Sequence, residues 1–173
     1  GDVQMPDIAV DVRHLHITRS QLTLTDKPAF LFTRGRQRVQ DMFEMLRIRH
    51  RLDADEFVDT PLVWANINTN SPRQLDVPMA LGIIDMARAG QVCGMTPFTL
   101  AGAMAPVSLA GALLLQHAEA LAAITLAQLT RAGAPVIYGG FTSNVDLRSG
   151  SPAFGTPEAV QGAIATGQLA RLI

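Results

Sequence analysis

The chain has 173 residues, of which 48% are hydrophobic. This length is enough for one ordinary core, and this composition excludes a disordered chain. The 14 basic and 15 acidic residues give a formal net charge of -1, so no positive field is available for nucleic acid, and we expect no nucleic-acid partner. The single cysteine, Cys93, excludes an internal disulfide and agrees with a reducing compartment, so we expect a cytoplasmic protein.

Residues 1–28 have no compelling periodicity, and we expect them to form an irregular lead-in segment. They contain no basic stretch that leads into an apolar run, so nothing in them indicates secretion. From residue 29 onward, strand-like and helix-like runs alternate four times. The strands are expected at 29–33, 61–68, 91–98 and 135–143, and the helices at 35–51, 76–90, 107–132 and 157–173. This alternation predicts an α/β fold with a parallel sheet.

Two of the expected helices carry unusual side chains. The first holds several arginines beside apolar positions at helical spacing, and we interpret these arginines as a solvated face. The third contains the longest apolar run, Leu109 to Leu129, but Gln116, His117 and Glu119 interrupt it. A bilayer centre would penalise these polar groups, so we expect a buried helix of a soluble protein and no membrane partner.

The choice between an open sheet and a barrel depends on nucleotide motifs. No G-x-G-x-x-G turn and no G-x-x-x-x-G-K-[ST] loop occurs, which weakens the case for an open nucleotide-binding sheet. A (β/α)8 TIM barrel is therefore the better prediction, with about four of its eight units present. Because the last helix runs to Ile173 without a cap, we expect residues 29–173 to be a partial barrel domain truncated at its C-terminus.

Barrel enzymes place their sites at the carboxyl ends of the strands. Alternation along 62–70 puts Trp64, Asn66, Asn68 and Asn70 on one face, so Asn68 and Asn70 are candidate substrate-binding residues at the barrel mouth. Asn-Ser-Pro is also a common turn sequence, and the alternative is that these amides only shape the loop.

Aromatic residues cluster near the other strand ends. Phe98 and Phe141 are candidates because ring faces attract a cation such as a quaternary ammonium group, and Ser143 follows on the same strand. Phe154, Trp64 and Tyr138 are further candidates of this kind. The alternative is that scattered aromatics only fill the core.

The segment from Val136 to Glu158 predicts a strand, a Gly/Ser loop and a helix that starts at Thr156-Pro157. The paired glycines Gly139 and Gly140 allow a close approach of backbone or ligand, although such loops often serve only as connections. No Ser/His/Asp or Cys/His arrangement and no zinc-site spacing is found, so the catalytic residues stay unassigned and no metal site is expected. His117, in the middle of a helix, is interpreted as structural.

Several ordered motifs resemble the trimethylamine:corrinoid methyltransferase family, which includes glycine betaine-type relatives without pyrrolysine. The matching segments are Thr96-Pro97-Phe98-Thr99-Leu100-Ala101-Gly102-Ala103-Met104, the run from Gln128 to Gly139, Ser149-Gly150-Ser151-Pro152-Ala153-Phe154-Gly155-Thr156-Pro157-Glu158, Gly167-Gln168-Leu169-Ala170-Arg171, Asn66-Ile67-Asn68-Thr69-Asn70-Ser71-Pro72 and Asp26-Lys27-Pro28. The resemblance implies a barrel that transfers a methyl group from a methylated or quaternary amine to the cobalt of a corrinoid carried by a separate partner protein. It also implies that the pyrrolysine position of the trimethylamine branch lies beyond Ile173.

Two alternatives to this enzyme are kept. The first is a catalytically incomplete barrel fragment that only binds a corrinoid protein or associates with itself, since open strand edges favour pairing; a homo-oligomer is expected in either case. The second is a barrel enzyme that binds a phosphate at Ser149-Gly150-Ser151 and the helix start at Thr156.

Overall fold

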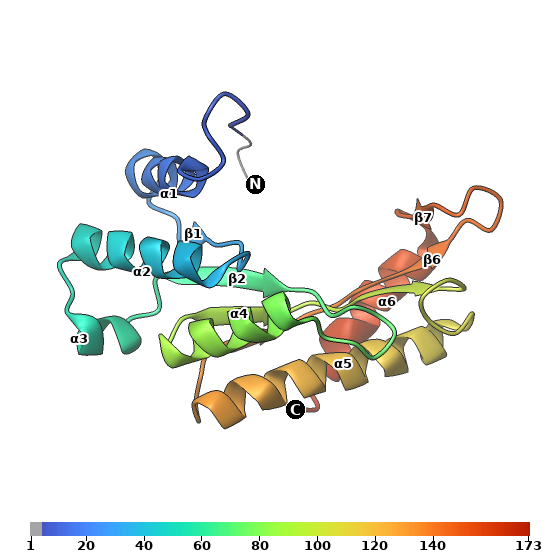
Figure 1. Cartoon of the computed structure of the whole chain (residues 1–173). Coiled ribbons are helices and arrows are strands. Elements are labelled where there is room, and N and C mark those ends of the chain that lie inside the picture. Colours follow the sequence, from blue (N-terminus) through green and yellow to red (C-terminus); the bar gives the residue numbers. More distant parts are fainter. Residues whose placement is uncertain (1–4) are drawn as a thin grey trace.

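The structure, a computed structural model, describes residues 5–173 (Figure 1). Its helices are α1 (Arg13–Leu24), α2 (Arg36–His50), α3 (Ala54–Val58), α4 (Val77–Arg88), α5 (Leu109–Thr130) and α6 (Pro157–Leu169). Its strands are β1 (Ala29–Phe30), β2 (Val63–Ile67), β3 (Val92–Met95), β4 (Phe98–Ala101), β5 (Val136–Tyr138), β6 (Phe141–Val145) and β7 (Pro152–Ala153).

The main sheet is parallel, as the alternation of strands and helices predicts. Its four strands lie in the order β1-β2-β3-β5, so their order in the sheet is their order in the chain. The predicted α/β fold with a parallel sheet is confirmed.

Two of the predicted strands are each divided in two. The run 91–98 bends at Thr96-Pro97 into β3 and β4, and the run 135–143 bends at Gly139-Gly140 into β5 and β6. β4 and β6 pair in parallel, and β7 adds to β6 in the antiparallel direction, so a second sheet of order β4-β6-β7 continues beyond the first.

The lead-in segment is not irregular throughout. Residues 1–4 lie outside the described part of the chain, but α1 is a helix of 12 residues that packs against α2 and β1. The expectation is wrong over these residues because α1 is stabilised by docking, not by a strong pattern of its own. His14 Nε2 lies 2.7 Å from Asp41 Oδ2 on α2, and Gln21 Oε1 accepts the backbone N–H of Phe30 at 2.9 Å.

The core lies between the main sheet and its helices. Val63, Ala65 and Ile67 of β2 are buried among side chains of α2, α4 and α5, whereas Asn66 between them is exposed. The predicted alternation along β2 is therefore confirmed, and it leaves the other face of the sheet more open. Exposed Ile137 of β5 lies on that same open face, because its register places it beside Gly94 and Asn66.

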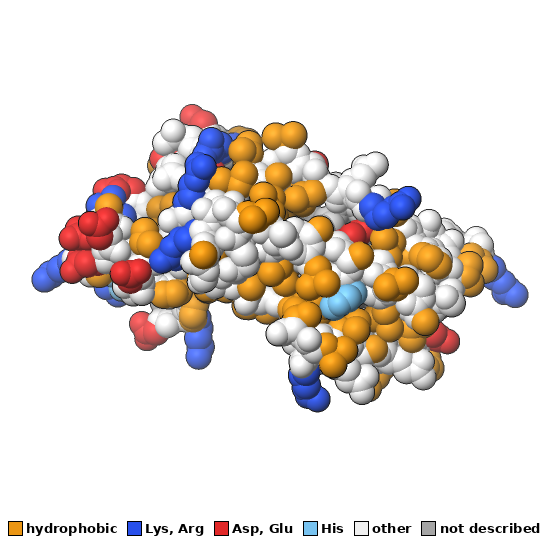
Figure 2. Space-filling view, turned by 90° about the horizontal axis from the view of Figure 1, so that it is seen from below, with side chains coloured by type: hydrophobic (Ala, Val, Ile, Leu, Met, Phe, Trp, Pro, Cys, Tyr) orange, Lys and Arg blue, Asp and Glu red, His pale blue; other side chains and the backbone are white. Residues whose placement is uncertain are grey.

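Helix α5 runs beside α4 along the sheet (Figure 1). Among residues 5–173 it is the one helix that is long and apolar enough, by length and composition, to cross a membrane, and 28% of its most apolar window is buried. Its buried side includes Gln116 and Glu119, both hydrogen-bonded to other elements, while Leu114 and Leu129 are exposed. Figure 2 shows the face viewed from below, where apolar side chains predominate over charged ones.

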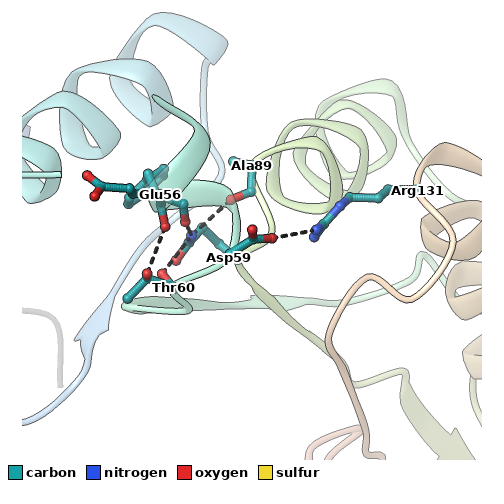
Figure 3. A network of polar contacts seen from close by, with 7 residues as sticks. Glu56, Asp59, Thr60, Ala89 and Arg131 are labelled. Atoms are coloured by element: carbon teal, nitrogen blue, oxygen red, sulfur yellow. Dashed lines mark hydrogen bonds and ion pairs between the residues drawn. The ribbon is translucent and has the colours of Figure 1, made fainter. Parts of the chain in front are cut away.

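The amino ends of β2 and β3 are held by one buried glutamine. Gln91, which is 0% exposed, accepts the backbone N–H groups of Leu62 and Val63 and donates to the carbonyls of Phe57, Thr60 and Ala89. Figure 3 shows polar contacts at this end of the sheet, including the ion pair of 3.5 Å between Arg131 and Asp59. The side-chain amide of Gln91 therefore provides hydrogen-bond partners for backbone groups of β2, of α3 and of the loops beside them.

Candidate functional site

Three phenylalanine rings meet on the second sheet. Phe98 of β4 and Phe141 of β6 are paired in register and stack with 5.3 Å between ring centroids and 16° between planes. Phe154, just after β7, meets Phe141 edge-on at 5.1 Å and Phe98 at 6.5 Å. We call these three residues the aromatic cluster. Phe141 is 48% exposed and Phe154 is 57% exposed, so the cluster presents ring surface to solvent and is not core filling.

The opposite face of the same strands is fastened to the helices. Thr99 and Thr142, each one residue after a cluster phenylalanine, have hydroxyls 2.5 Å apart. Thr142 Oγ1 donates to Gln116 Oε1 on α5, and Gln116 Nε2 donates to Thr166 on α6 at 3.0 Å. Because strand side chains alternate, this buried network fixes one face of β4 and β6 and directs the two rings to the other face.

Gly140 is needed by this network. A Cβ atom there would lie 2.0 Å from Cδ of Gln116, so no larger residue fits without moving the amide. A Cβ on Gly139 would lie 2.8 Å from Thr96. The close approach that the paired glycines indicate is therefore made by protein side chains.

The loop that carries Phe154 is held at two points. Ser143 Oγ is buried and donates to the carbonyl of Ala153 at 2.9 Å. Thr156 caps α6 through the N–H of Ala159, and its hydroxyl also donates to Asn144 Oδ1 at 2.8 Å. The predicted helix start at Thr156-Pro157 is confirmed, and Ser143 positions the loop beside the aromatic cluster.

The Gly/Ser part of this loop is exposed and held by Asp146. The Asp146 carboxylate accepts the N–H of Arg148 and the hydroxyl of Ser149, both at 2.9 Å. The N–H of Arg148, followed by the Ser149 hydroxyl, lowers the pKa of Asp146. These contacts stabilise the turn from within.

The two candidate asparagines have different partners. Asn68, after β2, is exposed and donates through Nδ2 to the carbonyl of Thr96 at 2.7 Å, so its amide bridges the ends of β2 and β3. Asn70 pairs with Gln74 through backbone bonds, and its Oδ1 accepts the N–H of Asp76, the N-cap of α4. Asn70 therefore shapes the loop in the way that the turn alternative describes.

A buried carboxylate on α5 holds that same loop. Glu119 accepts the hydroxyls of Thr69 at 2.5 Å and Ser71 at 2.7 Å, and the backbone N–H of Arg73 at 2.6 Å. This role of Glu119 was not predicted from the sequence. The signal that could have found it is a carboxylate inside an apolar helix, because such a group needs buried partners.

Two further aromatic residues, Trp64 and Tyr138, lie on opposite faces of the main sheet. Trp64 meets Phe30 edge-on at 4.8 Å on the open side of the sheet. Tyr138 instead turns to the helices, where its hydroxyl lies 2.9 Å from Nδ1 of His117. The expectation that Tyr138 presents a ring to a ligand is therefore not met, and the structural role predicted for His117 is confirmed. Burial raises the pKa of Tyr138.

Exposed ring faces and an exposed amide are the groups that this site offers to a ligand. Within residues 5–173, no group of three His, Cys, Asp or Glu side chains is placed as metal ligands would be. Exposed π-faces attract cations, and a quaternary ammonium group leaves no N–H donor unpaired when it lies against them.

Comparison of the sequence with known proteins identifies the family of the chain. Residues 2–173 match the family model described as trimethylamine methyltransferase. The chain belongs to this family. A glycine betaine methyltransferase of Desulfitobacterium hafniense is 38% identical over 165 residues, which are 95% of this chain and 34% of that protein.

Two further relatives share the family. A trimethylamine methyltransferase of another strain of Desulfitobacterium hafniense is 32% identical over 152 residues, covering 88% of this chain and 30% of the relative. A trimethylamine methyltransferase of Methanosarcina mazei is 34% identical over 144 residues, covering 83% of this chain and 29% of the relative. The chain thus spans about a third of the length of these curated relatives.

Proposed function

We propose that this chain forms part of a methyltransferase that moves a methyl group from a methylated or quaternary amine to a corrinoid carried by a separate protein in the cytoplasm. The observation that carries the proposal is the aromatic cluster of Phe98, Phe141 and Phe154 in a chain of this family. A quaternary amine has a fixed positive charge and no hydrogen-bond donor. The faces of aromatic rings attract such a cation without needing a donor, whereas a carboxylate binds a cation best when it accepts hydrogen bonds from it.

The residues of this chain would act by binding and orientation. The stacked pair Phe98 and Phe141 would hold the ammonium methyl groups, while Phe154 covers the rim and excludes water. Asn68, at the end of β2, is proposed as an amide contact at the same end of the strands. Asn70 and Ser143 are proposed to act indirectly, by fixing the loops that carry these contacts.

The corrinoid is the methyl acceptor and would be a second substrate of the enzyme. A reduced corrinoid supplies cobalt as the nucleophile that takes the methyl group. Such a large acceptor needs an open approach to the amine, and the exposed rings of Phe141 and Phe154 leave one.

The proposed architecture is a partial (β/α)8 barrel formed by residues 29–173. In its favour, four parallel strands lie in the same order as they occur in the chain, and one face of the sheet packs against α2, α4 and α5. An open doubly wound sheet would reverse its strand order at a switch point, and no reversal occurs in these four strands. The cluster then lies at the carboxyl end of the strands, where barrel enzymes bind their substrates.

The second candidate function is a module that binds a corrinoid protein or associates with itself. It is favoured by β1 and β5, which pair on one side only, and by exposed Ile137 on the open face. Exposed edges and apolar residues of this kind promote association between chains. Amine binding separates the two functions, because this module would associate and bind no amine.

The test is a titration of the 173-residue chain with glycine betaine and with trimethylamine at neutral pH, followed by NMR shifts of aromatic ring protons. We expect saturable shifts at Phe98 and Phe141, and binding about two- to thirtyfold weaker in Phe141→Leu, since a cation–π contact contributes roughly 0.5 to 2 kcal/mol. Phe141→Trp should restore binding. Phe32→Leu, which changes an exposed ring outside the cluster, is the matched control. Equal losses in Phe141→Leu and Phe32→Leu would contradict the site.

Methyl transfer itself is tested with the full-length enzyme. Mixing it with the amine and a reduced corrinoid protein should decrease the absorbance of cobalt(I), and no decrease with any methylated amine would reject the activity.

A further inference from the structure

A second cavity lies away from the aromatic cluster, between α1, β1 and α2. Its volume is about 510 Å³, within the range of roughly 300 to 1,000 Å³ that small-molecule sites occupy. Cations and rings share its wall, which includes Arg13, His14, Phe30, Phe32, Arg34 and Arg38. We call it the basic cavity.

The arginines of the basic cavity are only partly neutralised. Arg36, which lies between Arg34 and Arg38 in the sequence, forms a two-bond ion pair with buried Asp85 at 2.6 and 2.9 Å. Throughout residues 5–173, no carboxylate comes within ion-pair distance of Arg34 or Arg38. Arg34 instead lies 5.9 Å over the ring of Phe32. Two cations therefore remain at this wall without an anionic partner.

The helix beneath them increases the positive potential. Arg34 and Arg38 flank the N-terminus of α2, where the N-cap Gly35 has no side chain to cap the N–H groups and the first turn has no acidic residue. The N-terminus of a helix carries a partial positive charge, which disfavours cations there. An anion placed between these arginines would relieve this repulsion.

One further polar group of the wall is already engaged. Because the Asp41 carboxylate can only accept, His14 donates to it through Nε2 at 2.7 Å. His14 Nδ1 is buried, so it offers no surface to a ligand in the cavity. The rest of the wall is apolar at Ile17, Met42 and Phe30.

We propose that the basic cavity binds a small organic carboxylate, with the anionic group between Arg34 and Arg38 and an apolar or aromatic body against Phe30. The apolar part of the wall favours an organic anion over inorganic phosphate, which would leave that part uncovered. This site is independent of the proposed methyl transfer, because it uses none of the residues of the aromatic cluster.

The test uses benzoate as the probe, with isotope-labelled chain and NMR detection of the arginine Nε–H groups. We expect saturable shifts at Arg34 and Arg38, and no saturable shift with benzamide, which has the same shape without the charge. Arg38→Gln should weaken benzoate binding about tenfold, because it removes a charge-assisted hydrogen bond. Arg19→Gln removes an exposed charge of α1 that does not line the cavity, and it should change binding by less than about twofold.

Several outcomes would overturn the proposal. They are equal binding of benzamide, equal losses in Arg38→Gln and Arg19→Gln, or shifts produced by inorganic phosphate and not by benzoate. Because Arg38 and Arg19 are exposed, both variants should fold, and their circular dichroism spectra check this directly. Loss of amine binding in Phe141→Leu would leave the benzoate result unchanged, so the two sites fail separately.

Discussion

The two ends of the parallel strands are built in opposite ways. At the amino end, buried Gln91 satisfies two backbone N–H groups and three carbonyls, and no part of its amide faces solvent. At the carboxyl end, β4 and β6 present stacked rings that are half exposed, and the amide of Asn68 is exposed beside them. At the amino end, the Gln91 amide and its backbone partners are hydrogen-bonded inside the fold and stabilise it. At the carboxyl end, ring surface and an amide group stay exposed and can contact a ligand.

The largest expected effect is at the amino end. Gln91→Ala should lower the free energy of unfolding by about 3 to 5 kcal/mol, because it leaves several backbone groups buried without partners. Urea unfolding measures this loss, with Gln168→Ala on the exposed side of α6 as control. The folded fraction should still bind the amine. A loss below about 1 kcal/mol would break the comparison, since the amino end would then not be the stabilising one.

Gly140→Ala tests how the carboxyl end is fastened. The added Cβ would overlap the buried amide of Gln116, so we expect a loss of about 2 kcal/mol together with weaker stacking of Phe98 on Phe141. Gly167→Ala is the matched control, because nothing lies within 4 Å of its Cβ position. In the last turn of α6 that change should stabilise the chain by less than about 1 kcal/mol. Thermal unfolding of both variants measures whether each change lowers or raises the stability of the chain. A stabilising effect of Gly140→Ala would contradict the close packing of Gln116 against Gly140.

Glu119→Ala tests the loop that carries Asn68 and Asn70. Removal of the carboxylate leaves the Thr69 hydroxyl and the Arg73 N–H without acceptors, at a cost of about 2 kcal/mol. Glu119→Gln should cost less, since an amide can accept from one partner and donate to a hydroxyl. Hydrogen exchange at the Arg73 amide should be faster in Glu119→Ala, and the exposed change Glu44→Ala should leave it unaffected. Unchanged exchange would show that Glu119 does not hold the loop.

The smallest effect at neutral pH belongs to Cys93, which lies between the two ends. Burial raises the pKa of its thiol to about 12. The folded pKa is above the unfolded one, about 8.5, so this stabilisation is complete below the unfolded value and is lost as the pH rises toward the folded value. Cys93→Ala should therefore reduce the alkaline loss of stability and leave the neutral slope unchanged. Tyr138, whose pKa is also raised, titrates in both proteins. Identical alkaline slopes would contradict the burial of the thiol.

Local patterns predicted much of the fold. The alternation of buried Val63, Ala65 and Ile67 with exposed Asn66 was readable because side chains on a strand alternate strictly. The cap at Thr156-Pro157 was readable because it depends on neighbouring residues alone. Helix α1 was missed because its stability comes from contacts with Asp41 and β1, which a local pattern does not contain.

The candidate site was predicted only in part. Phe98 and Phe141 could be placed at strand ends, but their stacking required the pairing of β4 with β6, between segments some forty residues apart. Tyr138 could not be separated from the open-face aromatics, because the face it occupies depends on the register of β5.

The sequence by itself determined the alternation of strand and helix runs from residue 29 onward, the parallel sheet and the family, since each is encoded in local periodicity or in ordered motifs. Only the tertiary structure decided which polar groups are spent inside the fold and which remain for a ligand. Gln91, Gln116 and Glu119 are satisfied by segments distant in the chain, whereas Arg34, Arg38 and the aromatic cluster are not enclosed. The reason is that satisfaction and exposure are properties of three-dimensional neighbours, which residue type and spacing do not specify.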